Sequence, residues 1–144
     1  MTEVYKHYHI GYVPGVYDLF HIGHLNLIRK SKECCDYLIA GVLTDELVEY
    51  YKGSKPYIPM EERLAIIKAI RYVDEAVVVD FHNTDKLDAW EIYKYDCHFS
   101  GDDHAQEWQL LQRQLRERGS DMIFFGYTQS TSSTKIKGKI QDDI

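Results

Sequence analysis

Two histidines flank a glycine at the start of a predicted helix, in the segment 15–24 (GVYDLFHIGH). A helix N-terminus presents unpaired N–H groups and a partial positive charge, which suit an anion such as phosphate. His21 and His24 are three positions apart, so they face one side of that helix and can offer hydrogen bonds or a proton to phosphate oxygens. Gly23 has no Cβ, so a bulky anion can approach the backbone closely. The segment therefore predicts a phosphate-handling site.

Short apolar segments alternate with helical patterns along the chain. The predicted strands are 8–13, 37–43, 76–79, 97–100 and 122–125, and the predicted helices are 23–35, 44–51, 59–70, 84–93, 104–118 and 133–140. The core is expected to include Leu25, Leu27, Ile28, Leu64, Ile67 and Ile70. This alternation predicts one α/β domain over residues 1–144, a Rossmann-like parallel five-stranded sheet with helices on both faces.

Ligands of such sheets lie beyond the carboxyl ends of the strands. Three segments with chemistry-bearing residues, 15–24, 101–103 and 127–135, all follow predicted strands. We therefore expect them to meet at one edge of the sheet. Residues 52–58 (KGSKPYI) are the clearest predicted loop.

Composition limits the classes of partner. The chain has 144 residues, 44% of them hydrophobic, and a net charge of −6, which argues against broad binding to nucleic acid or to a membrane surface. There is no apolar run of membrane-spanning length and no signal-like start, so a cytoplasmic location is expected. Cys34, Cys35 and Cys97 fit buried, reduced thiols; a zinc site using Cys34, Cys35 and a histidine is the minor alternative, since the C-x₂-C spacing is missing.

The segment 15–24 resembles the H-x-G-H signature of the nucleotidyltransferase superfamily. Three more segments resemble the glycerol-3-phosphate cytidylyltransferases and their choline-phosphate and ethanolamine-phosphate relatives: 71–75 (RYVDE), 101–103 (GDD) and 132–137 (SSTKIK). All four occur in the family's order and near its spacing, over roughly residues 8–140. The resemblance implies transfer of CMP from CTP to a phosphorylated alcohol, first of all glycerol 3-phosphate to give CDP-glycerol. The acceptor phosphate would attack the α-phosphorus directly and release pyrophosphate, and Mg²⁺ or another divalent cation would arrive with CTP.

The resemblance also assigns residues by position. His21, His24 and Lys52 are the expected catalytic residues, and Lys86 and Asp103 are expected to bind the acceptor. The expected CTP-binding residues are Val16, Tyr17, Asp18, Ile22, Gly23, Lys55, Gly101, Asp102, Tyr127, Thr128, Ser132, Ser133 and Thr134. No residue is assigned as a metal ligand. The segment 71–75 resembles one near the subunit contact of these enzymes, which implies a homodimer.

Several of these residues have structural explanations as well. Asp18 could orient a lysine, hold a metal through water or cap its own turn. The carboxylates at 102–103 could serve only a turn, and the hydroxyls at 132–134 could serve only as a helix cap. Exposed lysines are often merely solvated, and Arg63 and Arg71 could form internal ion pairs.

The chain departs from the family pattern at positions that would read the acceptor or the phosphate tail. Tyr127 stands where the family has an arginine, and it lacks the charge and forked donors of that residue. His104 replaces a tryptophan, and the helix 104–118 looks longer than in the glycerol-3-phosphate enzymes. The alternatives are another phospho-alcohol, a sugar phosphate or an amino-alcohol phosphate as acceptor, ATP as donor, or a non-catalytic nucleotide-binding regulatory domain. The last is disfavoured because a retired site has no need of His21, Gly23, His24 and Lys52 together.

Overall fold

A single parallel sheet carries the structure of this chain, for which the computed structural model describes residues 7–126 and 136–139. The elements in chain order are β1 (Tyr8–Gly15), α1 (Ile22–Glu33), β2 (Cys35–Leu43), α2 (Asp45–Lys52), α3 (Met60–Ala69), β3 (Glu75–Val79), α4 (Lys86–Tyr93), β4 (Cys97–Gly101), the 3₁₀ turn η1 (Asp102–His104), α5 (Gln109–Glu117) and β5 (Asp121–Phe125). Residues 136–139 are also helical.

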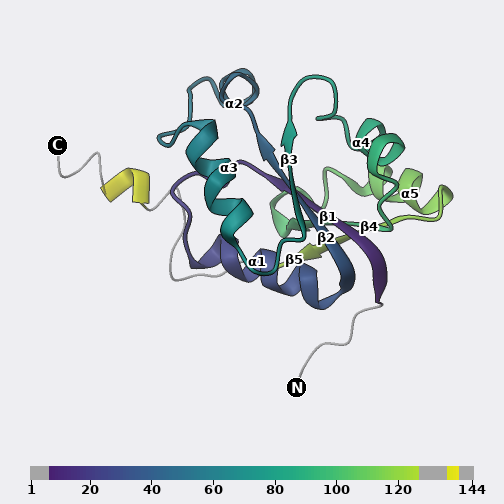
Figure 1. Cartoon of the computed structure of the whole chain (residues 1–144). Helices are drawn as coiled ribbons and strands as arrows, with labels where there is room; N and C mark the ends of the chain where they lie inside the picture. Colours follow the sequence, from purple (N-terminus) through teal and green to yellow (C-terminus); the bar gives the residue numbers. More distant parts are fainter. Residues whose placement is uncertain (1–6, 127–135, 140–144) are drawn as a thin grey trace.

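The five strands lie in the order β3-β2-β1-β4-β5, and every neighbouring pair is parallel (Figure 1). This confirms the predicted five-stranded Rossmann-like sheet. The chain runs outward from β1 through β2 to β3, then crosses to the other side of β1 to form β4 and β5. The strand order reverses between β1 and β4, and a ligand crevice is expected beyond the carboxyl ends of the strands at such a switch point.

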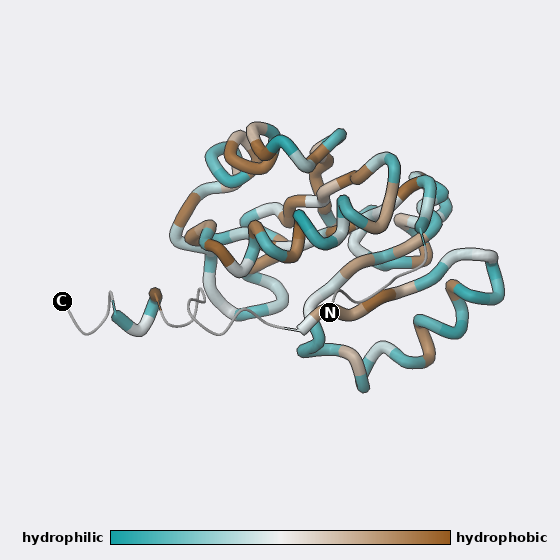
Figure 2. The backbone as a smooth tube through the Cα atoms, turned by 90° about the horizontal axis from the view of Figure 1, so that it is seen from below, coloured by the Kyte–Doolittle hydropathy of each residue, from teal (hydrophilic) through white to brown (hydrophobic). Residues whose placement is uncertain are grey.

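Helices cover both faces of the sheet, as the alternation predicted. One core lies under α1 and α3 and includes Ile28 and Ile67, while the other lies under α4 and α5 and includes Ala89 and Leu115. Figure 1 shows α4 and α5 together on one side, away from α1 and α3. Along the tube in Figure 2, hydrophobic and hydrophilic stretches alternate within the helices, as expected when one face of each is covered.

Local sequence explains where the short helices begin and end. The Thr44 hydroxyl accepts from the Leu47 N–H at the start of α2, and the Asp85 carboxylate caps α4 by accepting from the N–H groups of Leu87 and Asp88. Helix α2 stops at Gly53, whose φ of 82° lies in the left-handed region that favours glycine. Lys52 is therefore in the last turn of a helix rather than in the loop where the sequence placed it.

The predicted helix 104–118 is wrong in its first part. Asp102–His104 forms a 3₁₀ turn, residues 105–108 are turns, and α5 begins only at Gln109, so the helix is shorter than predicted. No side chain caps either start, and the His104 ring instead stacks on Trp108 with centroids 4.4 Å apart. The backbone of Trp108, with φ −102° and ψ 19°, lies outside the helical range and separates these turns from α5.

The three cysteines are free and buried, as expected for structural thiols. Within residues 7–126 and 136–139, no helix is long and apolar enough to cross a membrane. In that same part of the chain, no three His, Cys, Asp or Glu side chains are grouped so that they could hold a metal ion.

Candidate active site

The turn between β1 and α1 is held in a conformation that side chains rarely adopt. Tyr17 and Leu19 both have positive φ angles, 57° and 50°. Tyr17 is nevertheless buried, and its hydroxyl donates to the Val13 carbonyl oxygen at 2.8 Å. Its ring lies over Gly15, where an added Cβ would be 3.0 Å from the ring. Gly15 and Tyr17 together fix the path of the chain into α1.

Both histidines of the motif take part in starting α1. The His21 Nδ1 accepts from the Gly23 N–H at 3.0 Å, and the His24 Nδ1 accepts from the His21 N–H at 3.3 Å, which makes a reciprocal capping box. A backbone N–H can only donate, so each Nδ1 must be unprotonated. In the neutral rings the proton is then on Nε2. The two rings lie with centroids 4.0 Å apart, and each has one N–H to donate to a ligand.

The surroundings keep these imidazoles neutral. Burial lowers the pKa of His24 to about 4, and the nearby positive charges of His21 and Lys52 act in the same direction, against the opposing effect of Asp18. Burial also lowers the pKa of His21. At neutral pH the pair therefore offers hydrogen-bond donors and no net charge.

Acidification should destabilise the fold through its buried histidines. His98 of β4 is 1% exposed, and burial lowers its pKa to about 3, with the charge of Lys86 adding to the effect. Both His24 and His98 bind a proton more readily in the unfolded chain, where the ordinary pKa is 6.5. Their contribution to stability is therefore complete above pH 6.5 and is lost as the pH falls from 6.5 toward 4.

We expect the free energy of unfolding to fall over that range by up to about 1.4 kcal/mol per pH unit for each histidine. Urea unfolding at pH 7.5, 6.5, 5.5 and 4.5 measures it. The matched variant is His98→Phe, which should have a shallower dependence than the wild type. An identical pH dependence in the two proteins would contradict the assignment to His98.

A buried arginine connects three segments that border the cleft. Arg63 of α3 is fully buried; its guanidinium donates to the Val16 carbonyl at 2.7 Å, to the Ile58 carbonyl at 2.8 Å and to Asp45 at 2.7 Å. One side chain thus joins the β1–α1 turn, the 53–59 loop and the start of α2. The internal ion pair that the sequence left open for Arg63 is confirmed.

Asp18 contacts a lysine, as the sequence had suggested, and has a second role that the sequence did not predict. Its carboxylate accepts from the Tyr57 N–H at 2.8 Å and the Ile58 N–H at 3.0 Å, so it fastens the loop to the site. It also lies 3.6 Å from the Lys137 ammonium, which brings a lysine from the far end of the chain to the motif. Burial and the charge of Lys137 lower the pKa of Lys52, while Asp18 and Asp103 oppose that effect.

A cleft of about 850 Å³ opens beside these groups. Of the residues assigned from the sequence, it is lined by Val16, Tyr17, Asp18, His21, Gly23, His24, Lys52, Lys86, Gly101 and Asp103. The segments 15–24 and 101–103 therefore meet at one edge, as predicted. Their roles toward a ligand stay predictions, because what is established is their position around one cavity.

Some assigned residues lie elsewhere. The Ile22 side chain is 45% exposed, Lys55 is exposed, and neither lines the cleft. Asp102 is also outside the lining, although its carboxylate lies near Gly126. Tyr127, Thr128, Ser132, Ser133 and Thr134 lie outside the described residues, as does half of the predicted helix 133–140, whose residues 136–139 are helical.

The cleft contains further residues that the sequence did not assign. Lys137 reaches it from the helical turn at 136–139, and His98, Glu107 and Trp108 line it beside Lys86. The Lys86 ammonium lies 3.8 Å from the centre of the Trp108 ring. Burial lowers the pKa of Lys86, opposed by the negative charges of Asp85 and Glu107. His98 stands in β4 between Cys97 and Phe99, whose side chains are buried on the other face of the sheet. A polar residue between two apolar residues of a strand is the sequence signal that could have indicated His98.

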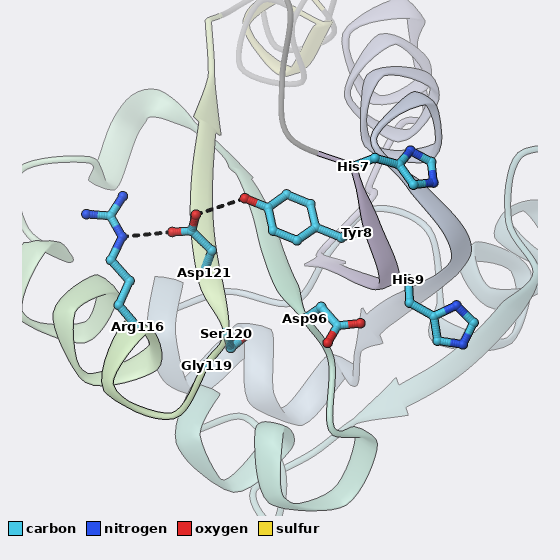
Figure 3. A pocket seen from close by; sticks show the side chains of 8 residues that line it. All are labelled: His7, Tyr8, His9, Asp96, Arg116, Gly119, Ser120 and Asp121. Carbon is cyan, nitrogen blue, oxygen red and sulfur yellow. Dashed lines mark hydrogen bonds and ion pairs between the residues drawn. The ribbon is translucent and has the colours of Figure 1, made fainter.

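A second hollow, of about 460 Å³, lies at the amino ends of the strands, away from the motif (Figure 3). Three of its polar side chains bind one another, because the Tyr8 hydroxyl and the Arg116 Nε both donate to Asp121, at 2.8 and 3.0 Å. Asp96 accepts from the Ile10 N–H at 2.8 Å. The chemistry predicted from the sequence gathers in the cleft at the carboxyl ends.

Comparison with known proteins agrees with this geometry. The family described as Cytidylyltransferase-like matches residues 12–139. A glycerol-3-phosphate cytidylyltransferase of Staphylococcus aureus is 34% identical over 126 residues, covering 88% of this chain and 90% of the relative. An FAD synthase of Pyrococcus horikoshii is 38% identical over 107 residues, covering 74% and 72%. The crystal structure of a lipopolysaccharide core biosynthesis protein from Thermoplasma volcanium has the same fold, with a TM-score of 0.70 at 24% identity over 86% of this chain and 99% of that one.

Fold, site and relatives define an α/β nucleotidyltransferase. The chain belongs to the cytidylyltransferase-like family. The resemblance stated from the four sequence segments is thereby confirmed.

Proposed function

We propose that this enzyme transfers CMP from CTP to a phosphorylated alcohol, glycerol 3-phosphate, and releases pyrophosphate. The observation that carries the proposal is the pair of neutral imidazoles at the N-terminus of α1, in one cleft with Lys52 and Lys86. The similarity to glycerol-3-phosphate cytidylyltransferases supports the choice of CTP and of this acceptor.

The reaction exchanges one bond for another at the α-phosphorus. An oxygen of the acceptor phosphate forms a bond to that phosphorus, and the bond to the pyrophosphate oxygen breaks, so pyrophosphate leaves with the electron pair. Negative charge accumulates on the oxygens around phosphorus during this exchange. The fixed donors for those oxygens are the Nε2–H groups of His21 and His24 and the N–H groups of the first turn of α1 other than that of Gly23, which His21 already binds. Preorganised stabilisation of this kind lowers such barriers.

In this scheme each of the two lysines binds the negative charge of one substrate. Lys52, beside the histidines, would hold the triphosphate, while Lys86, on the far side of the cleft, would hold the acceptor phosphate. Holding two anions against each other requires cations on both sides, and positioning of this kind supplies a large part of the acceleration in two-substrate reactions.

The part of the chain that the structure describes has no cluster of acidic side chains and histidines suited to caging a metal ion. Mg²⁺ is commonly bound through substrate phosphates and water rather than by a protein cage. We therefore propose that the divalent cation is carried by CTP, and no step above depends on a protein ligand to it.

A second candidate keeps the site and changes the donor to ATP. The FAD synthase of Pyrococcus horikoshii, 38% identical, is the observation that favours it.

A homodimer also remains a proposal. In the segment 71–75 that suggested it, Asp74 forms an ion pair with Lys32 at 2.7 Å within the chain. The Arg71 guanidinium donates to the hydroxyl of its neighbour Tyr72 at 3.0 Å, and Arg71 is exposed.

A pyrophosphate-release assay distinguishes these candidates. It pairs each of CTP, ATP, GTP and UTP with glycerol 3-phosphate, phosphoethanolamine, phosphocholine and FMN. We expect release only with CTP and glycerol 3-phosphate. Release with ATP and FMN would support the second candidate instead, and binding of a nucleotide without release for any pair would indicate a regulatory domain.

A further inference from the structure

One side chain in the cleft has polar atoms that nothing in the described chain satisfies. His98 is 1% exposed, and neither its Nδ1 nor its Nε2 has a hydrogen-bond partner within residues 7–126 and 136–139. Its ring is enclosed by aromatic side chains, with centroids 5.8 Å from Tyr12, 6.1 Å from Tyr95 and 6.2 Å from Trp108. A buried polar group left without a partner costs about 1–3 kcal/mol, so its presence calls for an explanation.

The position of His98 supplies one. It lines the cleft next to Lys86 and Trp108, on the side of the acceptor rather than beside the His21–His24 pair. Because burial lowers its pKa to about 3, the ring is neutral and has one N–H donor and one lone pair. An alcohol hydroxyl, which both donates and accepts, is the matching group.

Charge argues against a cationic acceptor here. An aromatic face can attract an ammonium group, but the face of Trp108 is already covered by the Lys86 ammonium at 3.8 Å. The carboxylate of Glu107, the residue before Trp108, lies 2.8 Å from the His104 Nδ1. A second cation would meet the charge of Lys86, whereas a phosphate would be attracted by it.

We propose that His98 is a specificity-determining residue that hydrogen-bonds a hydroxyl of the acceptor. This inference rests on the proposed function, since it names the residue that recognises the acceptor. Sites built to pair with a hydroxyl reject analogues that lack it, because the buried polar group is then left unpaired.

The test compares glycerol 3-phosphate with its two monodeoxy analogues, 2-hydroxypropyl phosphate and 3-hydroxypropyl phosphate, in the wild type and in His98→Phe. We expect the wild type to prefer glycerol 3-phosphate over at least one analogue by about tenfold or more in kcat/KM, the scale of one hydrogen bond. His98→Phe should lose that preference and leave the KM for CTP unchanged. His98→Gln, which restores a donor and an acceptor, should recover part of it.

Two controls separate recognition from folding. His9→Phe makes the same change at an exposed histidine at the other end of the sheet and should retain the preference of the wild type. His98→Phe should melt no lower than the wild type, since it removes polar atoms that have no partner among the described residues. A lower melting temperature with unchanged acceptor preference would make His98 a structural residue and overturn the inference.

The remaining outcomes are also decisive. Turnover of phosphocholine or phosphoethanolamine, which have no free alcohol hydroxyl, in preference to glycerol 3-phosphate would refute recognition of a hydroxyl by His98 while leaving nucleotidyl transfer intact. If the wild type releases no pyrophosphate with any pair, the proposed function fails, and calorimetric titration of glycerol 3-phosphate then tests His98 alone. Binding that His98→Phe weakens would support its role, and equal binding or none would refute it.

Discussion

Replacing either histidine of the H-x-G-H motif with alanine should lower kcat at least about 100-fold, the scale of losing one fixed donor to a transition-state oxyanion. Each Nδ1 is occupied by a backbone N–H, so in the proposed mechanism it is the Nε2–H of each ring that binds the reacting phosphate. Steady-state pyrophosphate release with His21→Ala and His24→Ala measures the effect. Near-normal turnover in either variant would remove that histidine from the catalytic assignment.

Alanine at position 21 also removes a helix cap, which costs about 1 kcal/mol of stability. The control is His21→Asn, because asparagine is a good N-cap and supplies an acceptor for the Gly23 N–H but has no imidazole Nε2–H. We expect His21→Asn to regain the melting temperature of the wild type and to remain as slow as His21→Ala. Recovery of both the melting temperature and the turnover in His21→Asn would mean that helix capping alone explains His21.

Replacing Arg63 with methionine should lower the free energy of unfolding by about 3–5 kcal/mol, as expected when one partner of a buried ion pair is removed. The substitution leaves the carboxylate of Asp45 and the carbonyls of Val16 and Ile58 without their donor. Urea unfolding at pH 7.5 measures the loss. Activity should fall as well, because those carbonyls belong to the turn and the loop that border the cleft.

Arg63→Lys and Asp45→Asn are the matched variants. Lysine keeps the charge but cannot supply the forked donors that reach three acceptors, so it should recover only part of the stability. Asp45→Asn should cost less than Arg63→Met, since the Asp45 side chain is 24% exposed and water can reach it. A loss below about 1 kcal/mol in Arg63→Met would contradict the role of Arg63 as the anchor of the site.

The sheet and most helices could be predicted because their signals are local. The near-continuous apolar run of β2, the threonine cap of α2 and the alternation of elements are all readable from neighbouring residues. The segment after β4 was mispredicted because its residues are helical in periodicity, whereas the backbone leaves the helical range at Trp108, whose ring contacts Lys86 and Phe124 from other elements. Contacts between distant parts of the chain have no short-range signature.

The site was predictable where the residues are contiguous and much less so where the fold assembles them. His21, Gly23 and His24 occupy one helical turn, whereas Lys137 reaches Asp18 across 119 positions (137 minus 18). His98 occupies one face of a five-residue strand, and a lone histidine in such a strand is usually a packed core residue. Its unsatisfied nitrogens become visible only when the surroundings of the ring are known.

The two imidazoles cap α1 and, in the proposed mechanism, also donate to the substrate. This limits which substitutions can follow once catalysis is no longer selected. If selection for catalysis is lost, position 21 must still present an acceptor to the Gly23 N–H, or α1 loses the start of its first turn. Drift there should favour asparagine, serine or aspartate, which cap helices well, whereas position 24 needs only a side chain that can bond back to the preceding turn. A descendant that has abandoned the reaction should therefore be recognisable by an intact cap without an imidazole.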